Sequence, residues 1–315
     1  MIDLSIIIPT YNRRPWLDEL LDSIAAQDLP ADRFEVLVVD DGSTDTTAGV
    51  AERRFPFHLR YFHQANSGDA AARNLGARQT GAELLLFLDD DILLEPGYVG
   101  KVLASHAGGE RRIVVGRDLL WLSAHSPLAE LTAALPAGGG SAEAIPFAEV
   151  CSNNMSLRRT AYFEIGMMEA LDFKGSSMWC DVDFAYRAYQ AGYEFIRNGE
   201  AVCWHRDYVH KSLDSQVKRM EEVAFRAVAL FEKYPALVEH LPMFVDKTPI
   251  DWSADGPRRI LRKLLRRVSA AGPVLWALER GEAVLGDRSP GRTLRRWIVG
   301  AHIMRGYRRG VRNHV

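Results

Sequence analysis

The sequence is poor in cysteine and has no long apolar run. Its three cysteines, Cys151, Cys180 and Cys203, are an odd number and include no Cys-x-x-Cys pair. This argues against a disulfide framework and for a reducing compartment. No stretch reaches the roughly 20 apolar residues of a membrane span. Because Met1-Ile2-Asp3 opens without a basic leader, we expect a cytoplasmic protein without an export signal.

Two glycine-rich phosphate loops are also missing. No Gly-x-Gly-x-x-Gly follows the first predicted strand, and no Gly-x-x-x-x-Gly-Lys-Ser/Thr occurs. The usual backbone cradles for a dinucleotide or a triphosphate are therefore excluded. A site that contacts phosphates without such a loop can use a divalent metal between the phosphate oxygens.

Length and composition fit a globular protein with one large domain or two. The chain has 315 residues, of which 47% are hydrophobic and 25% charged. The net charge of −2 hides an asymmetry, because residues 256–315 carry +12 and the rest of the chain carries −14. Two oppositely charged parts therefore join near residue 255.

Strand and helix patterns alternate from residue 4 to residue 91. Short apolar runs predict strands at 4–8, 35–39 and 83–88, with a weaker one at 59–62. Helical spacing predicts helices at 15–26 and 68–78, and a further helix that runs from a Ser43 or Thr44 cap towards Arg54. This alternation is typical of a parallel sheet covered by helices on both faces.

Polar residues follow three of the predicted strands. They are Pro9-Thr10-Tyr11-Asn12, Asp40-Asp41 and Asp89-Asp90-Asp91. Because ligands bind outside the carboxyl ends of strands in such sheets, we expect all three to converge on one crevice. Three adjacent carboxylates repel one another, and a divalent metal would compensate them. A solvated acidic turn would explain each of these segments alone, but not all three together.

Four motifs, in this order, resemble the family 2 glycosyltransferases of the GT-A fold. They are Ile6–Asn12, Val38–Asp45, Ala72–Gly76 and Phe87–Asp91. The resemblance implies a nucleotide-sugar donor, UDP-sugar by default, and Mn²⁺ or Mg²⁺. It places Asp89 and Asp91 at the ends of the family's Asp-x-Asp motif, with Asp91 as the direct metal ligand. It also implies a nucleotide site made of Pro9, Thr10, Tyr11, Asn12, Asp40, Asp41, Arg73, Asp89 and Asp90. For Tyr11 and Arg73 the alternative roles are a packing residue and a helix-surface charge.

The resemblance continues more weakly beyond residue 92. Cys151–Arg159 is similar to the family's strand beneath the sugar, which makes Asn153 and Asn154 candidates for the sugar or acceptor site.

Residues 178–187 begin a further predicted helix, with Asp181 and Asp183 in its first turn. The helix dipole favours carboxylates there, which is a sufficient structural explanation. The family has Glu-Asp-x-Asp at this place, with the second residue as catalytic base. The resemblance therefore implies that Asp181 is the base and that Trp179, Cys180 and Asp183 lie at the acceptor site, although Cys180 replaces the Glu.

The strand predicted at 201–205 ends in His205. A His near this point completes the metal or pyrophosphate site in many relatives, so His205 is a candidate metal ligand, and an ordinary surface His is the alternative. A zinc site made of Cys180, Cys203 and His205 lacks the usual ligand spacing, which favours buried apolar cysteines instead.

The C-terminal part is predicted to be helical and basic. An apolar stripe predicts a helix at 211–234, and prolines at 242, 249 and 257 indicate a connector. Leucines then alternate with Arg and Lys from 258 to 268, and 294–299 repeats this pattern. Such helices suit an anionic membrane surface. Packing on the acidic catalytic domain and a homodimer interface are the alternatives. Nucleic-acid binding is not expected, because no recognisable module is present.

The sequence thus predicts a GT-A domain at 1–210, with a nucleotide-binding half at 1–91 and an acceptor half at 92–210. A helix and connector at 211–255 and a basic amphipathic helical extension at 256–315 follow. The predicted function is inverting, metal-dependent sugar transfer to a lipid-linked or cell-envelope glycan at the inner face of the plasma membrane. A nucleotidyltransferase should show a glycine-rich, basic triphosphate loop near the first strand. A non-catalytic membrane adaptor would leave the strand-end carboxylates unexplained.

Overall fold

The computed structural model describes residues 2–120, 142–170, 178–206, 212–286 and 288–314. They form two compact units, Met1–Asp207 and Tyr208–Val315. The predicted boundary at 210–211 lies outside the described residues. The second unit contains both the segment 211–255 and the basic extension 256–315.

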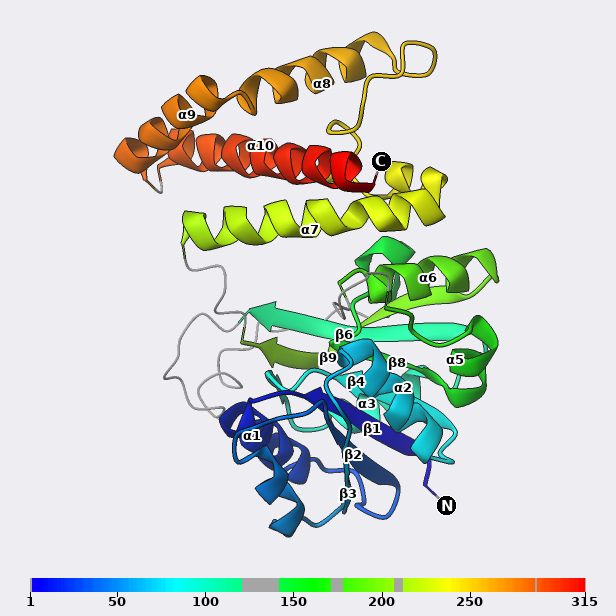
Figure 1. The fold of residues 1–315 in the computed structure, drawn as a ribbon. Helices are drawn as coiled ribbons and strands as arrows, with labels where there is room; N and C mark the ends of the chain where they lie inside the picture. The colour runs from blue at the N-terminus through cyan, green and yellow to red at the C-terminus, as the bar shows by residue number, and fades with distance from the viewer. Residues whose placement is uncertain (1, 121–141, 171–177, 207–211, 287, 315) are drawn as a thin grey trace. The chain divides into compact units, whose positions relative to one another are not determined.

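The described part of the first unit contains one nine-stranded mixed sheet in the order β3-β2-β1-β4-β8-β6-β9-β5, with β7 paired to β9 (Figure 1). The strands are β1 Leu4–Thr10, β2 Phe34–Asp40, β3 His58–His63, β4 Leu84–Leu88, β5 Ile92–Leu94, β6 Arg112–Leu120, β7 Glu143–Ala144, β8 Asn154–Arg158 and β9 Glu194–His205. The helices are α1 Arg14–Ala25, η1 Thr47–Glu52, α2 Asp69–Gln79, α3 Tyr98–Ser105, η2 Phe147–Glu149, α5 Arg159–Ile165 and α6 Cys180–Gln190.

The first four strands in sequence form the parallel part of the sheet. β1 pairs in parallel with β2 and β4, and β2 pairs in parallel with β3. Every residue of β1, β2 and β4 is buried, as expected for strands covered on both faces. The predicted parallel sheet is therefore confirmed for this half. In the other half, β8 runs antiparallel to both β4 and β6, and β5 runs antiparallel to β9.

The two faces of β1 meet different helices. Ile6 and Ile8 belong to a core cluster with residues of α1 and α3. Ile7 points to the opposite face, where its Cγ2 would lie 2.5 Å from a Cβ added at Gly76 of α2. Gly76 therefore allows α2 to lie close against the sheet.

One predicted helix differs from the structure. The segment after Asp45 forms the short 3-10 helix η1, and no hydroxyl side chain caps it. Instead, Asp45 Oδ1 accepts a hydrogen bond from Thr47 N at 2.9 Å. A carboxylate satisfies one of the amides at this end of the helix.

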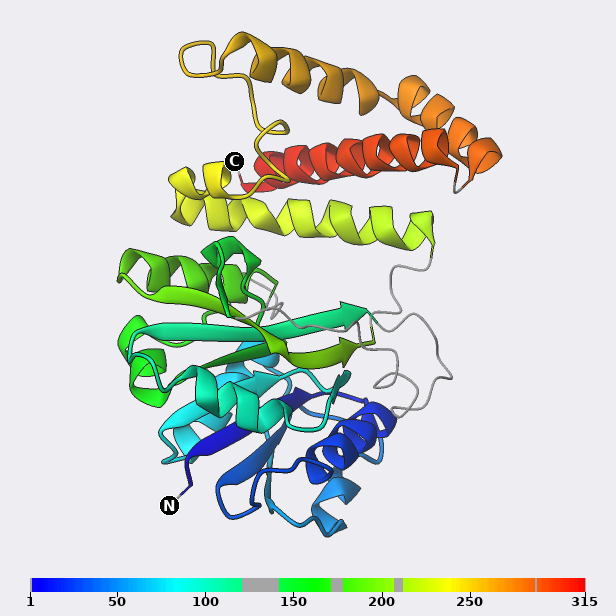
Figure 2. The same cartoon turned by 180° about the vertical axis from the view of Figure 1, so that it is seen from behind.

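The second unit is helical, with α7 Leu213–Lys233, η3 Pro235–His240, α8 Pro257–Ser269, α9 Gly272–Leu285 and α10 Ser289–His314. Within this unit, α10 lies between α7 on one side and α8 and α9 on the other (Figures 1 and 2). Gly306 of α10 approaches α7 so closely that an added Cβ would lie 2.0 Å from Glu221 O. Small residues thus bring these two helix backbones together.

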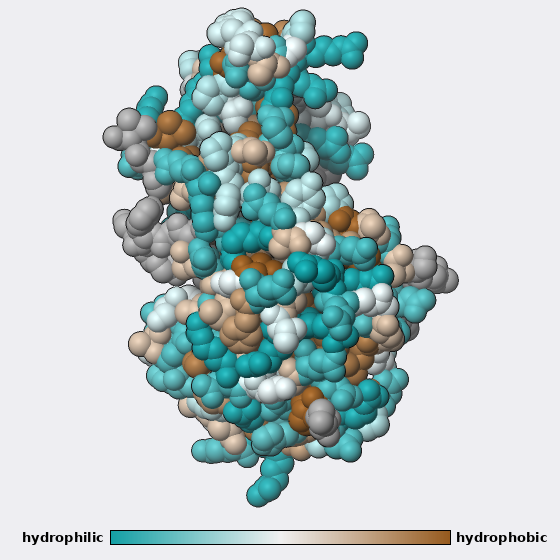
Figure 3. Space-filling model, turned by 90° about the vertical axis from the view of Figure 1, so that its right-hand side faces the viewer, coloured by the Kyte–Doolittle hydropathy of each residue, from teal (hydrophilic) through white to brown (hydrophobic). Residues whose placement is uncertain are grey.

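The surface of the molecule carries both kinds of side chain. On the face drawn in Figure 3, apolar residues are interspersed with hydrophilic ones. Within the described ranges, no helix has both the length and the apolar content needed to cross a bilayer.

Candidate active site

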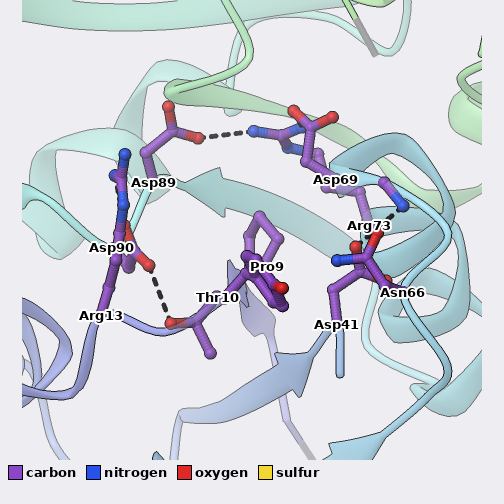
Figure 4. Close-up of a pocket in the computed structure, with 11 residues that line it drawn as sticks. Pro9, Thr10, Arg13, Asp41, Asn66, Asp69, Arg73, Asp89 and Asp90 are labelled. Carbon is purple, nitrogen blue, oxygen red and sulfur yellow. Dashed lines mark hydrogen bonds and ion pairs between the residues drawn. The ribbon is translucent and has the colours of Figure 1, made fainter. Parts of the chain in front are cut away.

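A cavity of about 390 Å³ opens at the carboxyl ends of β1, β2 and β4 (Figure 4). All three predicted polar segments contribute to its wall, as expected for this edge of a parallel sheet. The lining residues are Pro9, Thr10, Tyr11, Arg13, Asp41, Asn66, Gly68, Asp69, Arg73, Asp89 and Asp90.

Asp41 shapes one side of this cavity. Its Oδ1 accepts hydrogen bonds from Gln64 Nε2 at 2.7 Å and Ser67 N at 2.8 Å, and its Oδ2 accepts one from Gly68 N at 2.8 Å. These bonds fold the segment before α2 and bring Asn66 to the cavity wall. Gly42 has a φ of +88°, and an added Cβ would lie 2.9 Å from Asn66 N, so only glycine fits there.

Asp40 and Asn12 hold the surrounding loops and do not line the cavity. Asp40 accepts hydrogen bonds from Tyr61 OH at 2.5 Å and from Ser43 N at 2.7 Å. Asn12 Oδ1 accepts a hydrogen bond from Thr44 N at 2.8 Å. Both side chains thus connect β1, β2 and β3, and their contact with a nucleotide stays a prediction.

Arg73 is buried between two carboxylates. It is 1% exposed, and its guanidinium donates to Asp69 Oδ2 at 2.6 Å and to Asp89 Oδ1 at 2.5 Å. Burial raises the pKa of Asp89, and Arg73 offsets this only in part. Arg73 is thus not a helix-surface charge. It fixes one oxygen of Asp89 at the cavity wall.

Arg13 compensates the other two carboxylates of the motif. Its Nη1 lies 3.0 Å from both Asp90 Oδ1 and Asp91 Oδ2, and Thr10 Oγ1 donates to Asp90 Oδ2 at 2.8 Å. Burial raises the pKa of Asp90 to about 7, although Arg13 and Thr10 act in the opposite direction. Arg13 therefore neutralises part of the negative charge that a metal was expected to balance.

Asp91 and His205 meet because β5 pairs with β9. This antiparallel pairing places Ile92 opposite His205, and His205 Nε2 lies 3.2 Å from Asp91 Oδ1. Burial lowers the pKa of His205, but the neighbouring Asp91 carboxylate raises it overall to about 9.

Asp89, Asp91 and His205 form a group that fits a divalent cation. One ligand atom from each lies within 4.8 Å of the other two. Asp91 Oδ1 is buried beside His205 Nε2 and accepts no well-aligned hydrogen bond among the described residues, so it has a lone pair available for a metal. Among the described residues, neither Cys180 nor Cys203 belongs to this group, and both cysteines are buried. The group therefore differs from the zinc site of Cys180, Cys203 and His205 considered above.

Asp181 and Asp183 both lie in the first turn of α6, but their surroundings differ. Asp181 is partly exposed, and its Oδ1 accepts a hydrogen bond from Val182 N at 2.8 Å. Burial raises the pKa of Asp181, while Val182 N–H and Arg73 lower it.

Asp183 and Cys180, the other predicted acceptor residues of this turn, are both buried. Asp183 is fully buried and pairs with Arg187, whose Nε and Nη2 lie 2.9 and 2.7 Å from Asp183 Oδ2. Cys180 is 2% exposed. Both side chains are therefore buried, and their place at the acceptor site stays a prediction. Trp179 is half-buried, with a left-handed φ of 72° immediately before the helix.

Asn153 and Asn154 line a second cavity of about 210 Å³, together with Asp118. Asn153 Nδ2 donates to Asp118 Oδ2 at 2.6 Å, and Asn153 Oδ1 is buried without a partner. The Asn153 carbonyl also accepts a hydrogen bond from Asp89 N at 3.0 Å. Asn153, which directly precedes β8, therefore connects this cavity to the carboxylate motif.

Comparison with known proteins agrees with this geometry. Residues 5–118 match the family model described as Glycosyl transferase family 2. Validoxylamine A glucosyltransferase of Streptomyces hygroscopicus subsp. jinggangensis is 48% identical over 118 residues, which are 36% of this chain and 28% of that relative. The poly(ribitol-phosphate) beta-N-acetylglucosaminyltransferase TarS of Staphylococcus aureus is 38% identical over 94 residues, or 29% of this chain and 16% of that relative.

Solved structures show the same fold along most of the chain. Mannosyltransferase PcManGT of Pyrobaculum calidifontis, in complex with GDP-Man and Mn²⁺, has a TM-score of 0.61 at 20% identity and covers 99% of this chain and 88% of its own. TarS 1–349 of S. aureus in complex with UDP has a TM-score of 0.56 at 20% identity, with 98% and 92% covered.

The fold is thus that of the GT-A glycosyltransferases, as predicted. The chain carries a glycosyltransferase family 2 domain, and its curated relatives are glycosyltransferases. The matched part of this chain spans about a quarter of the length of the validoxylamine enzyme.

Several polar residues of the two cavities, among them Arg13, Asn66, Asp69 and Asp118, were not singled out from the sequence. Asn66 and Asp69 come from the polar segment before α2, where Gly68 was a signal for a turn. Arg13 directly follows the first motif, and Asp118 lies on β6. Asp118 had no sequence signal, because its role depends on the pairing of β6 with β8 and β9.

Proposed function

We propose that this chain is an inverting, metal-dependent glycosyltransferase whose donor is a nucleoside-diphosphate sugar, with UDP as the nucleotide. The observation that carries this proposal is the Asp89, Asp91 and His205 group at the edge of the strand-end cavity. The two carboxylates supply hard oxygen ligands, which suit Mn²⁺ or Mg²⁺ beside a diphosphate, and the imidazole adds a nitrogen ligand.

The donor would occupy the cavity that Asp41 and Asn66 help to line. Tyr11 is 46% exposed there and offers an aromatic face to a nucleobase. Asp89, Asp91 and His205 would hold the cation, which neutralises the charge that grows on the leaving diphosphate. Arg13 and Arg73 fix the carboxylates and so keep the arrangement ready before the donor binds.

Asp181 is the proposed general base. An acceptor hydroxyl is a poor nucleophile until a carboxylate takes its proton. The Asp181 carboxylate is partly exposed and interacts with the charge of Arg73. The Asp183 carboxylate is instead buried in an ion pair with Arg187. The hydroxyl oxygen attacks the anomeric carbon as the bond to the diphosphate breaks, and its proton passes to Asp181. Attack opposite the leaving group inverts the configuration.

The sugar or acceptor would reach the second cavity. The unpaired Asn153 Oδ1 can accept a hydrogen bond from a sugar hydroxyl, and Asn154 supports this wall through its bond to Asp118. A sugar hydroxyl that is buried on binding needs a hydrogen-bond partner, because a buried hydroxyl without one costs binding free energy.

We further propose that the acceptor is a lipid-linked or cell-envelope glycan and that the second unit binds the inner face of an anionic membrane. The evidence is the orientation of α8. Lys263 is 2% exposed, and its Nζ donates to Asp255 Oδ2 at 2.6 Å and to Pro249 O at 2.8 Å. By contrast, Leu261 and Val268 are each 57% exposed. This helix thus turns apolar side chains to the solvent and several charges to the protein.

The outward face of α8 and α9 is apolar with basic residues on it. Trp276 is 60% exposed and Val284 is 82% exposed, while Arg258 and Arg262 are exposed on α8. Apolar side chains that enter the headgroup region, beside arginines that pair with lipid phosphates, are the pattern of an interfacial helix. Anionic lipid satisfies both features, which a purely apolar partner would not.

Calorimetric titration with UDP, GDP and dTDP, with and without Mn²⁺, tests the catalytic proposal. We expect a diphosphate nucleotide to bind and Mn²⁺ to strengthen that binding. Binding only of a nucleoside triphosphate would favour a nucleotidyltransferase, and absence of any nucleotide binding would favour a non-catalytic adaptor.

A further inference from the structure

The second unit contains a cavity of about 230 Å³ whose rim is basic and whose wall is partly apolar. It lies between α8, the C-terminal part of α10 and residues 247–249. Lys247, Arg267, Arg308 and Arg312 supply the positive charge. The wall includes Pro249, Met304 and Val311.

The charges of this cavity are unevenly compensated. Lys247 is 7% exposed, and its Nζ donates to Asp246 Oδ1 at 2.5 Å, so that cation has a partner. Within the part of the chain that the structure describes, no carboxylate pairs with Arg267, Arg308 or Arg312. Burial, together with the charges of Arg267 and Arg312, lowers the pKa of Arg308. The guanidinium groups of Arg267 and Arg312 therefore repel that of Arg308, and an anion would relieve this repulsion.

The geometry points to a binding site for a phosphate group that carries an apolar substituent. Guanidinium groups match phosphate oxygens in shape and donate two parallel hydrogen bonds. Tyr307 and Thr248 add hydroxyl groups to the same cavity. Met304, which is 1% exposed, and Val311 offer apolar contact to the group attached to the phosphate. This site is separate from the strand-end cavity and goes beyond the proposed transfer reaction.

Titration of the full-length chain in EDTA tests this site. The two probes are dihexanoyl phosphatidic acid, kept below its micelle concentration, and inorganic phosphate. We expect the short-chain lipid to bind about tenfold or more tightly than phosphate, because only the lipid reaches the apolar wall. Equal affinity for the two probes would overturn the assignment, since the apolar wall would then contribute nothing.

Two pairs of substitutions separate the site from general electrostatic attraction. Arg308→Ser with Arg312→Ser removes two rim charges and should weaken lipid binding about tenfold or more. Arg292→Ser with Arg296→Ser removes two exposed charges of the same helix outside the cavity and should change the affinity by less than about twofold. Equal weakening by both pairs would contradict a defined site.

A third variant keeps every arginine. Val311→Asp should weaken lipid binding, because it places a carboxylate in the apolar wall. Unchanged lipid binding by Val311→Asp would also overturn the assignment. Binding of UDP with Mn²⁺ should be the same in all these variants, so failure of this site is distinguishable from failure of the proposed transferase activity.

Discussion

His205 Nε2 lies 3.2 Å from Asp91 Oδ1, although the two residues are far apart in the sequence of the first unit. The antiparallel pairing of β5 with β9 brings them together, and Arg206 N donates to Asp91 O at 3.1 Å beside them. Because backbone hydrogen bonds hold both strands in place, Asp91 and His205 are already positioned side by side. Little free energy is then needed to assemble them as metal ligands.

Replacement of His205 by alanine should weaken Mn²⁺ binding about 10- to 100-fold, because one of three protein ligands is lost. Calorimetric titration with Mn²⁺ measures this directly. His63→Ala is the matched control, since His63 is an exposed histidine at the end of β3. Unaltered Mn²⁺ affinity in His205→Ala would remove His205 from the proposed site.

Asp181 and Asp183 should respond differently to the same change. Asp181→Asn should leave nucleotide binding and the melting temperature nearly unchanged and lower kcat about 10²- to 10⁴-fold, as expected for loss of a general base. Asp183→Asn should instead destabilise the fold by about 3 kcal/mol, because Arg187 loses the ionised partner of a buried pair. Transfer assays and thermal unfolding of both variants measure these effects. Normal transfer by Asp181→Asn would refute its role as base.

Gly76→Ala should destabilise the first unit by about 1–3 kcal/mol, because the added methyl group would overlap Ile7 and push α2 from β1. Since Arg73 lies one turn earlier on α2, nucleotide binding should weaken as well. Denaturant unfolding and nucleotide titration measure both effects. Gly81→Ala is the control, because an added Cβ there meets nothing within 4 Å. Equal stability of the two variants would contradict the tight packing at Gly76.

The outward face of α8 should decide membrane binding. Leu261→Glu with Val268→Glu should lower recovery with anionic liposomes in flotation, because two carboxylates would have to enter the headgroup region. Gln79→Glu with Gln190→Glu adds the same charge at exposed positions of the first unit and should have little effect. Binding should also fade with salt. Equal recovery with neutral lipid would count against an anionic membrane, and a change in oligomeric state in the α8 variant alone would favour the homodimer alternative.

His106 should make the first unit sensitive to acid. Burial, with a smaller effect of Arg112, lowers the pKa of His106 to about 4. Its Nε2 hydrogen bonds with Ser156 Oγ at 2.9 Å, while Nδ1 is buried without a partner, so the neutral ring fits the site. Between pH 6.5 and pH 4 the unfolded chain binds this proton and the folded chain does not. The stabilisation is therefore complete above pH 6.5 and is lost as the pH falls towards 4, by at most about 3 kcal/mol.

Comparison of His106→Asn with the unaltered chain over this range measures the contribution. We expect the melting temperature of the unaltered chain to fall more steeply from pH 6.5 to pH 4 than that of the variant. Parallel pH profiles for the two proteins would show that His106 does not carry this proton linkage.

Local sequence patterns determined much of the first unit. The buried runs that became β1, β2 and β4 are hydrophobic along their whole length, so their strands were predictable without any knowledge of their partners. The polar residues at their ends followed from the strand order, because parallel strands present their carboxyl ends at one edge. This reasoning placed Asp89 at the crevice, whereas Arg73, which contacts it at 2.5 Å, was placed there only by the family resemblance.

Only the tertiary structure decided which polar side chains face that crevice and which support it. Asp181 and Asp183 lie two residues apart, yet one stays partly exposed and the other is sealed against Arg187, because successive side chains of a helix point in different directions. The same holds for α8, where the alternation of leucine and basic residues predicted an amphipathic helix but not that Lys263 would be the buried side. Sequence periodicity defines the faces of an element, whereas the partners that cover each face lie outside that element. Asp255 lies in the connector just before α8, and β9, which lies beside Asp91, comes from a segment far away in the sequence.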